Sequence, residues 1–276
     1  MTPSCIDPFE VLRALIFEHS GIRLTRKDDG VLKARVARRL RALRLGSAVE
    51  YLRLLRGPDG PIEIQALLDA VTINYTFFFR EPQSFQFLTA QALPELLGPS
   101  SSGNRRRVRV WSAGCSSGEE PYSIAMTLAE AIPDTRTHDF RVLATDINRR
   151  VLTVGAQGVY PQSRVTNVPQ EYRSKYLTKD AHTPPAHYRM CSDLRAAVAF
   201  RRLNILDEVS SFRGVFDAVF CRNVMIYFDE PTKVRLLRTF HSCLVPGGHL
   251  LIGASETLSG LPHPFLPVGP SAYRRR

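Results

Sequence analysis

Short runs of strand-forming residues, separated by stretches with helical spacing, fill the second half of this sequence. Four such runs cover residues 108–111, 141–145, 216–221 and 249–253. Strands that alternate with helices are typical of βαβ units, in which helices cover a mainly parallel sheet. The pattern therefore predicts an α/β fold for the second half of the chain.

The first part of the chain has a different pattern. Residues 9–56 carry apolar side chains at helical spacing without an internal proline, and the run Gly-Pro-Asp-Gly-Pro at residues 57–61 ends this segment. A chain of 276 residues is long enough for one large domain and a smaller companion. We therefore predict a small all-helical domain over residues 1–71 and an α/β domain over residues 72–276.

Residues 157–200 interrupt the alternation of strands and helices. Several tyrosines and basic residues lie there between Pro161, Pro169, Pro184 and Pro185. We interpret this stretch as an insertion that forms a small subdomain. A second irregular stretch, Gly-Pro-Ser-Ser-Ser-Gly-Asn at residues 98–104, has the composition of a flexible connector.

Composition and cysteine use exclude several classes of protein. Hydrophobic residues make up 44% of the chain and charged residues 23%, as in ordinary globular proteins. The N-terminus lacks the pattern of a signal peptide, and no apolar run approaches the roughly 20 residues that a membrane helix needs. The five cysteines are scattered without a C-x-x-C pair. We expect a cytoplasmic protein with no membrane insertion and no metal.

The chain is strongly basic, with a formal net charge of +11. This charge favours an acidic partner, which could be nucleic acid, an anionic membrane face or an acidic protein. Within the helix predicted at residues 31–45, the apolar stripe lies opposite a basic face that carries Arg35, Arg38 and Arg41. That face is either a solvated surface or an electrostatic docking site, and the pattern alone does not separate the two.

A turn of small residues follows the first predicted strand, at residues 112–118, and leads into a predicted helix. Its spacing matches neither a dinucleotide fingerprint nor a phosphate-binding loop. Glu119 and Glu120 follow the turn, and Asp146 ends the next strand, where a carboxylate can accept hydrogen bonds from ribose hydroxyls. Carboxylates near the turn repel phosphates and attract an ammonium group, which favours S-adenosylmethionine over NAD or ATP. Acids at a helix N-terminus also have a simpler explanation in the helix dipole.

Several segments together closely resemble the CheR family of chemotaxis methyltransferases over residues 9–273. The segments that carry the resemblance are Asn-Tyr-Thr-Phe-Phe-Phe-Arg-Glu at 74–81, Val-Trp-Ser-Ala at 110–113, Gly-Glu-Glu-Pro-Tyr-Ser at 118–123, Ala-Thr-Asp-Ile at 144–147, Leu-Asn-Ile-Leu at 203–206 and Phe-Asp-Ala-Val-Phe-Cys-Arg-Asn-Val-Met-Ile-Tyr-Phe at 216–228.

This resemblance implies a fold and an activity. The implied fold is a Rossmann-like S-adenosylmethionine-dependent methyltransferase domain with a small inserted antiparallel β-subdomain, preceded by the helical domain. The implied activity transfers a methyl group from S-adenosylmethionine to glutamate side chains of chemoreceptors, which gives glutamate methyl esters and S-adenosylhomocysteine. The implied partners are the cytoplasmic methylation helices of these receptors, and we expect a monomer that does not bind nucleic acid.

The resemblance also implies the site residues. Those that match the family's cofactor contacts are Asn74, Thr76, Arg80, Glu120, Asp146, Asn204, Ile205, Arg222 and Asn223. Arg80 and Tyr227 match its active-site pair, and the basic helix with Arg35, Arg38 and Arg41 becomes the expected dock for acidic methylation helices. Between Glu119 and Glu120, we favour Glu120 as the cofactor contact.

The expected chemistry needs no general base, because a glutamate with a pKa of about 4.3 is already ionised at neutral pH. Positioning of the two reactants must therefore supply most of the catalysis.

Two alternatives remain open. A nucleic-acid methyltransferase would fit the basic charge, but residues 222–225 are Arg-Asn-Val-Met where amino-methylating enzymes carry Asp/Asn-Pro-Pro followed by an aromatic residue. A signalling module that binds S-adenosylmethionine without turnover would not need Arg80 and Tyr227.

In relatives that bind a receptor's C-terminal peptide, a glycine-rich loop lies in the insertion, whereas residues 179–186 here contain Pro184 and Pro185 and no glycine. We therefore expect substrate recognition without that peptide.

Overall fold

The computed structural model describes residues 7–97, 106–132, 138–180, 186–207 and 212–276. It divides into two compact units, Met1–Ile73 with Tyr227–Lys233, and Asn74–Ile226 with Val234–Arg276. The sequence pattern indicated a change of structure near residue 72. It did not indicate that a short segment around Tyr227 groups with the helical unit, because that segment is distant from it in the sequence.

The first unit is all-helical in the part that precedes Ile73. Its helices are α1 (Pro8–Ser20), the 3-10 helix η1 (Arg26–Asp28), α2 (Asp29–Leu43), α3 (Ala48–Leu55) and α4 (Gly60–Val71). Helix α1 begins where the Asp7 side chain accepts the N–H of Phe9, and it ends at Gly21 with φ 70°. The core is formed by apolar residues at helical spacing, among them Leu12, Ile16, Leu32, Val36, Tyr51, Leu67 and Leu68.

A buried ion pair links two of these helices. Glu63 in α4 is only 6% exposed, and its carboxylate accepts hydrogen bonds from Arg39 in α2 at 2.6 and 2.9 Å. The hydroxyl of Tyr51 donates to the same carboxylate at 2.5 Å. Burial, together with this bond to Glu63, raises the pKa of Tyr51. A buried carboxylate is costly unless it is paired, so Glu63 depends on the half-buried Arg39 for a compensating charge.

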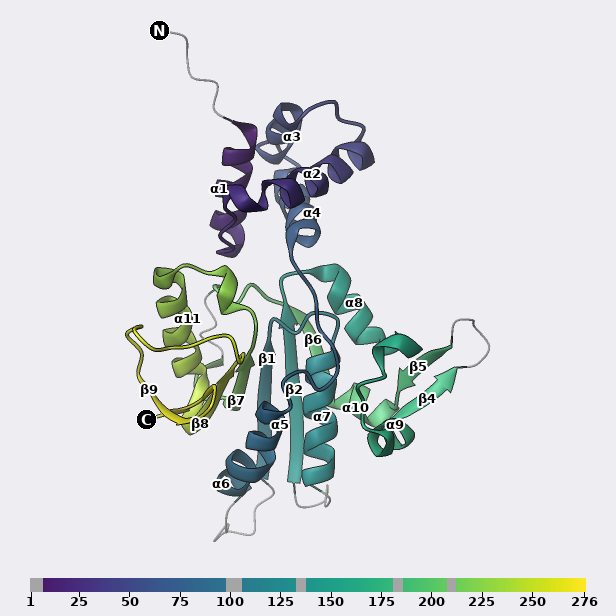
Figure 1. Cartoon of the computed structure of the whole chain (residues 1–276), viewed down its shortest axis with the longest axis vertical. Helices are drawn as coiled ribbons and strands as arrows, with labels where there is room; N and C mark the ends of the chain where they lie inside the picture. The colour runs from purple at the N-terminus through teal and green to yellow at the C-terminus, as the bar shows by residue number, and fades with distance from the viewer. Residues whose placement is uncertain (1–6, 98–105, 133–137, 181–185, 208–211) are drawn as a thin grey trace. The chain divides into compact units, whose positions relative to one another are not determined.

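The second unit contains a seven-stranded sheet (Figure 1) in the order β6-β2-β1-β7-β8-β10-β9. Its strands are β1 (Arg106–Ala113), β2 (His138–Asp146), β6 (Val198–Arg202), β7 (Phe216–Cys221), β8 (Leu244–Ile252), β9 (Phe265–Gly269) and β10 (Ala272–Arg275). The pairs among β6, β2, β1, β7 and β8 are parallel, whereas β10 is antiparallel to both of its neighbours.

Helices cover both faces of this sheet. The helices in this part of the sequence are α5 (Gln83–Phe87), the π-helix η2 (Leu88–Ala92), α6 (Leu93–Leu97), α7 (Glu119–Ala131), α8 (Arg149–Gln157), the 3-10 helix η5 (Met225–Tyr227) and α11 (Glu230–Cys243). Residues Tyr227–Lys233, from the end of η5 into α11, group with the first unit. Val110 of β1 belongs to the core cluster that also contains residues of α7. The ring of its neighbour Trp111 packs against Phe240 of α11, with 5.4 Å between the ring centroids. Alternate side chains of one strand thus enter two apolar layers, which confirms the predicted α/β fold.

The insertion forms a small antiparallel sheet in the order β3-β5-β4. Its elements are β3 (Val159–Pro161), the 3-10 helix η3 (Gln162–Arg164), α9 (Gln170–Tyr176), β4 (Leu177–Asp180), β5 (His187–Met190) and α10 (Ser192–Ala197). Residues 198–200, which the sequence pattern placed in the insertion, begin β6 and pair with β2 of the large sheet. Pro184 and Pro185 lie outside the described residues, as does the connector at 98–104.

None of the helices in the described ranges is both long enough and apolar enough to cross a bilayer.

Candidate active site

The carboxyl ends of four parallel strands gather most of the predicted site residues. Because β6, β2, β1 and β7 run in one direction, their carboxyl ends lie at one edge of the sheet. Asp146 ends β2, and Arg222 follows β7 directly. The N–H of Leu203 donates to the carbonyl of Asp146 at 3.1 Å, which brings Asn204 to the same edge. Open α/β sheets bind ligands at this edge.

The turn after β1 has a backbone that requires glycine at two positions. Gly114 has φ 84°, and a Cβ there would lie 2.5 Å from the side chain of Val224. Gly118 has φ 96°, and a Cβ there would lie 2.8 Å from the Cα of Gly155. Both residues adopt a conformation that side chains disfavour, at points where other chain segments approach closely. The predicted small-residue turn is therefore a close-approach turn.

Asp146 holds this turn in place. Its carboxylate, in a residue that is 8% exposed, accepts the N–H of Ser116 and the N–H of Asn148, both at 2.9 Å. The hydroxyl of Ser116 in turn donates to the carbonyl of Asn74 at 2.9 Å. Three segments that lie far apart in the sequence therefore meet at Ser116, and two of them contribute predicted cofactor residues.

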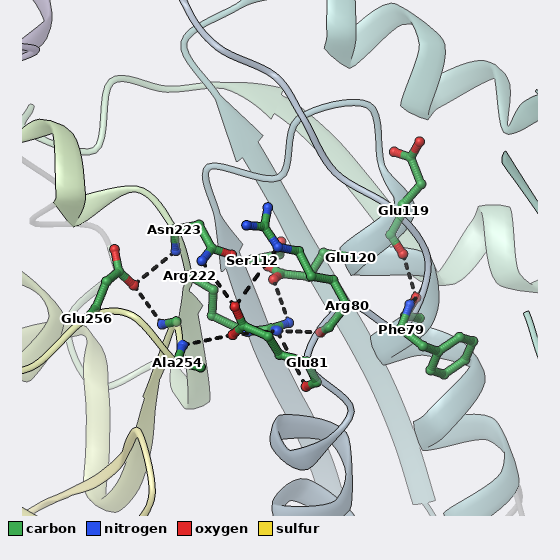
Figure 2. Close-up of polar contacts among 12 residues, drawn as sticks. Phe79, Arg80, Glu81, Ser112, Glu119, Glu120, Arg222, Asn223, Ala254 and Glu256 are labelled. Atoms are coloured by element: carbon green, nitrogen blue, oxygen red, sulfur yellow. Dashed lines mark hydrogen bonds and ion pairs between the residues drawn. The ribbon is translucent and has the colours of Figure 1, made fainter. Parts of the chain in front are cut away.

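Arg222 is the centre of a second group of polar contacts (Figure 2), and its side chain is 1% exposed. Its Nη1 lies 3.1 Å from the carboxylate of Glu120, and its Nη2 lies 3.1 Å from the carboxylate of Glu81. The guanidinium also donates to the carbonyl of Arg80. Among the described residues, the buried Nε atom of Arg222 has no hydrogen-bond partner. Buried polar atoms are almost always paired, so this atom is an exception within the cluster.

Two carboxylates, Glu81 and Glu120, share the guanidinium of Arg222, and Arg80 is a second cation near Glu81. Burial raises the pKa of Glu120, and Arg222 and the hydroxyl of Ser112 only partly offset that effect. Burial also acts to raise the pKa of Glu81, but the N–H of Ala254, Asn223 and Arg222 outweigh it and the pKa is lowered. A cationic ligand beside Glu120 would offset the cost of burying its carboxylate.

The loop after β7 is fixed by a further carboxylate. Glu256 accepts the backbone N–H groups of Asn223, Val224 and Gly253 at 2.9, 3.0 and 2.6 Å. The bond to Asn223 is drawn in Figure 2. Asn223 has φ 58°, and its side-chain amide donates to Glu81 at 3.2 Å. Glu256 therefore holds the backbone of Asn223 in a left-handed conformation from which its side chain reaches the Arg222 cluster.

Arg80 lies beside two aromatic rings. Its guanidinium carbon is 5.8 Å from the ring centres of both Tyr75 and Phe77, and its Nη1 donates to the carbonyl of Tyr75 at 3.0 Å. Its Nε is 4.0 Å from Glu81. The side chain is 27% exposed, so it is oriented by these contacts and still accessible.

The two adjacent glutamates at the start of α7 face different groups. Glu120 contacts Arg222 and Ser112, whereas Figure 2 shows the Glu119 side chain directed away from that cluster. Glu119 is 0% exposed and pairs with Arg164 at 2.9 Å. Glu120 is therefore the one that joins the other predicted cofactor residues.

Thr76, Ile205 and Tyr227, which are also predicted site residues, differ in burial and in the unit to which they belong. Thr76 is half-buried, and Ile205 is 7% exposed. Tyr227 belongs to the helical unit, where its carbonyl accepts the N–H of Arg23 at 2.9 Å, while Arg80 belongs to the α/β unit.

The predicted docking arginines of α2 are not equivalent. Arg38 and Arg41 are exposed. Arg35 is half-buried and donates to the carbonyl of Ala70 at 2.5 Å, so part of its side chain supports the helical unit.

Sequence reasoning assigned no role to Glu81, Glu256 or Ser112. Glu81 was visible only as the residue after Arg80, and Glu256 stood in no recognised segment.

Positive backbone φ angles mark this site in a way that the sequence alone does not show. Six non-glycine residues in the described ranges have positive φ, and four of them, Phe79, Glu81, Ser116 and Asn223, lie at this site. Such conformations concentrate at functional sites.

The described residues contain no group of three or more His, Cys, Asp or Glu side chains placed to hold a metal ion.

Two family models match this chain in succession. Residues 7–72 match the model described as "CheR methyltransferase, all-alpha domain", and residues 74–273 match "CheR methyltransferase, SAM binding domain".

Curated relatives match over nearly the full chain. A chemotaxis protein methyltransferase of Borreliella burgdorferi is 38% identical and covers 92% of this chain and 89% of its own length. Chemotaxis protein methyltransferase 2 of Pseudomonas aeruginosa is also 38% identical, and the match covers 97% of this chain and 92% of that protein. Among solved structures, the N-methyltransferase NodS of Bradyrhizobium japonicum in complex with S-adenosylhomocysteine has 16% identity, 60% of each chain covered and a TM-score of 0.32.

Replacing Asp146 with alanine should weaken the binding of S-adenosylhomocysteine by about 1.5 to 3 kcal/mol, because a charged acceptor is lost and the N–H of Ser116 loses its partner. Calorimetric titration measures this change. The matched control is Asp139→Ala, which removes a carboxylate near the opposite end of β2, where it pairs with Arg109. Equal affinities for the Asp146 and Asp139 variants would remove Asp146 from the binding site.

Proposed function

We propose that this chain, which belongs to the CheR methyltransferase family, transfers the methyl group of S-adenosylmethionine to glutamate side-chain carboxylates of chemoreceptors. The products would be glutamate methyl esters and S-adenosylhomocysteine. Family membership supports S-adenosylmethionine-dependent methyl transfer, and the names of the relatives support a substrate in chemotaxis. The observation that carries the proposal is the Arg222 cluster, in which two carboxylates share one buried guanidinium.

The cluster suits the methionine half of the cofactor. Glu120 offers a carboxylate to the ammonium group, and the unpaired Nε of Arg222 can donate to a carboxylate. Asp146, at the carboxyl end of β2, is placed to accept bonds from the ribose hydroxyls. The other residues that we assign to cofactor binding are Asn74, Thr76, Arg80, Asn204, Ile205 and Asn223. The sulfonium charge of the cofactor is compatible with a site that holds the mostly buried carboxylate of Glu120.

Methyl transfer to a carboxylate is an in-line displacement that needs an ionised nucleophile and no base. Glutamate in water meets this condition at neutral pH. We assign Arg80 and Tyr227 to hold the acceptor carboxylate in line with the methyl group. Contacts of Arg80 with two aromatic rings and with Glu81 restrict its orientation. Since carboxylate charge is lost in the transition state, a tight arginine clamp would favour the ground state, so Arg80 serves mainly for geometry.

Substrate docking is assigned to the helical domain, residues 1–71, and catalysis to residues 72–276. The exposed Arg38 and Arg41 of α2 fit an acidic helix of the receptor's cytoplasmic segment. Arg39 does not contribute there, because Glu63 neutralises it.

We propose that the protein acts as a monomer in the cytoplasm, without nucleic acid.

The reaction itself is testable with labelled cofactor. Incubation with S-adenosylmethionine that carries a labelled methyl group should label receptor cytoplasmic fragments, and mild base should release the label as methanol because esters hydrolyse. A base-stable product would contradict glutamate esterification, and labelling of nucleic acid instead would support the alternative substrate.

The assignment of Arg80 and Tyr227 predicts defects in methyl transfer without loss of folding. Arg80→Ala and Tyr227→Phe should each lower the single-turnover rate at saturating cofactor by about tenfold or more, within the range lost when a positioning contact is removed. Tyr172→Phe is a matched control, because it removes a phenol hydroxyl from the inserted subdomain. Normal rates in both variants would show that neither side chain positions the acceptor.

The docking assignment predicts a salt-dependent effect on KM. The double variant Arg38→Glu/Arg41→Glu should raise the KM for receptor fragments and flatten its dependence on ionic strength, because it removes charge attraction. Affinity for S-adenosylhomocysteine should not change. The double variant Arg53→Glu/Arg56→Glu in and after α3 makes the same charge change on exposed residues and is the control. An unchanged KM and salt profile for the α2 variant would mean that this face is only solvated.

A further inference from the structure

A fully buried carboxylate lies on the side of the turn away from Arg222. Glu119 is 0% exposed, and its Oε2 accepts the hydroxyl of Ser117 at 2.7 Å. Its Oε1 lies 2.9 Å from Nη1 of Arg164. Burial of a carboxylate is costly unless a cation and hydrogen bonds compensate for the lost hydration. In the described part of the chain, Arg164 is the cation that forms an ion pair with Glu119.

The compensating cation comes from the insertion. Arg164 ends η3, immediately after β3 of the small sheet, and its side chain is 48% exposed. The carboxylate, in contrast, belongs to the first residue of α7, next to the cofactor turn. An exposed arginine usually contributes little to stability, but here its partner is completely buried. The insertion therefore supplies a charge on which the turn depends.

The same subdomain also holds the turn at Ser117. Nη1 of Arg164 donates to the Ser117 hydroxyl at 2.9 Å, and the hydroxyl of Tyr160 in β3 donates to the Ser117 carbonyl at 2.8 Å. Tyr160 is 0% exposed. Ser117 is thus contacted by the insertion through both its side chain and its backbone.

Ser117 follows directly after the residue that organises the proposed cofactor site. Ser116 has φ 50°, and its contacts reach Asp146 and Asn74. Gly118, on the other side of Ser117, has φ 96°. Positive φ on both sides of Ser117 leaves the turn few alternative backbone paths, so a shift of Ser117 must move Ser116 and its contacts.

We propose that Arg164 is a positioning residue for the cofactor turn, acting through Glu119 and Ser117, and that the insertion is therefore a working part of the cofactor site. The inference rests on the proposed function only for the identity of the ligand. Arg164 does not contact the cofactor in this role. Its removal leaves an uncompensated charge beneath the turn, and cofactor affinity falls because the turn relaxes to relieve that charge.

The test is a double-mutant cycle with S-adenosylhomocysteine as the probe. Arg164→Ala should raise the Kd measured by calorimetry about tenfold, within the usual range for coupled residues. Adding Glu119→Gln to that variant should restore most of the affinity, because a neutral amide needs no cation. Arg164→Lys should also restore most of it. Arg189→Ala removes an exposed arginine from β5 of the same subdomain and should leave Kd unchanged.

Kinetics separate positioning from a general loss of structure. In Arg164→Ala, the KM for S-adenosylmethionine should rise while kcat at saturating cofactor stays within about twofold of the wild type, because excess cofactor can reorder the turn. If Arg164→Ala does not fold, the double variant and Arg164→Lys still provide the comparison.

Two results would overturn the inference. One is a Kd for Arg164→Ala within twofold of the wild type. The other is a loss of affinity in the double variant as large as in the single one. A wild-type protein that does not bind S-adenosylhomocysteine would instead refute the proposed function.

Discussion

The buried guanidinium of Arg222 is the contact on which the arrangement of the site depends. A charge that is 1% exposed must be paired, and its partners come from the segment before α5 and from the start of α7. One side chain at the end of β7 thereby fixes two other chain segments at the carboxyl edge of the sheet. The same contact holds Glu120 at the site, where its mostly buried carboxylate suits a cationic ligand.

Much of this organisation was predictable because it follows from local rules. The strand β1, the small-residue turn and Asp146 were recognised from alternation, turn chemistry and strand ends, and the family motifs indicated Glu120 and Arg222. Glu81 and Glu256 were not recognised, because their partners are distant in sequence. Glu81 meets Arg222 across 141 positions, and no periodic pattern encodes such a contact.

Boundaries and charges were harder to predict than elements. The start of β6 was assigned to the insertion because a five-residue strand next to a short helix gives too weak a pattern. On α2, the helical wheel placed Arg35, Arg38 and Arg41 on one polar face, but Arg35 reaches the carbonyl of Ala70. Long arginine side chains extend several ångströms from their helix, so position on the wheel does not determine what the charge contacts.

The ion pair between Glu119 and Arg164 also has a consequence for folding. A three-stranded sheet of strands three or four residues long buries too little apolar surface to be stable alone. The insertion must therefore acquire its structure on the surface of the larger unit, and the carboxylate at the start of α7 is one of the groups that it assembles upon. In native-state hydrogen exchange, the amides of the turn and of β3 would then open together as one cooperative unit, although more than forty residues separate Ser117 from Tyr160.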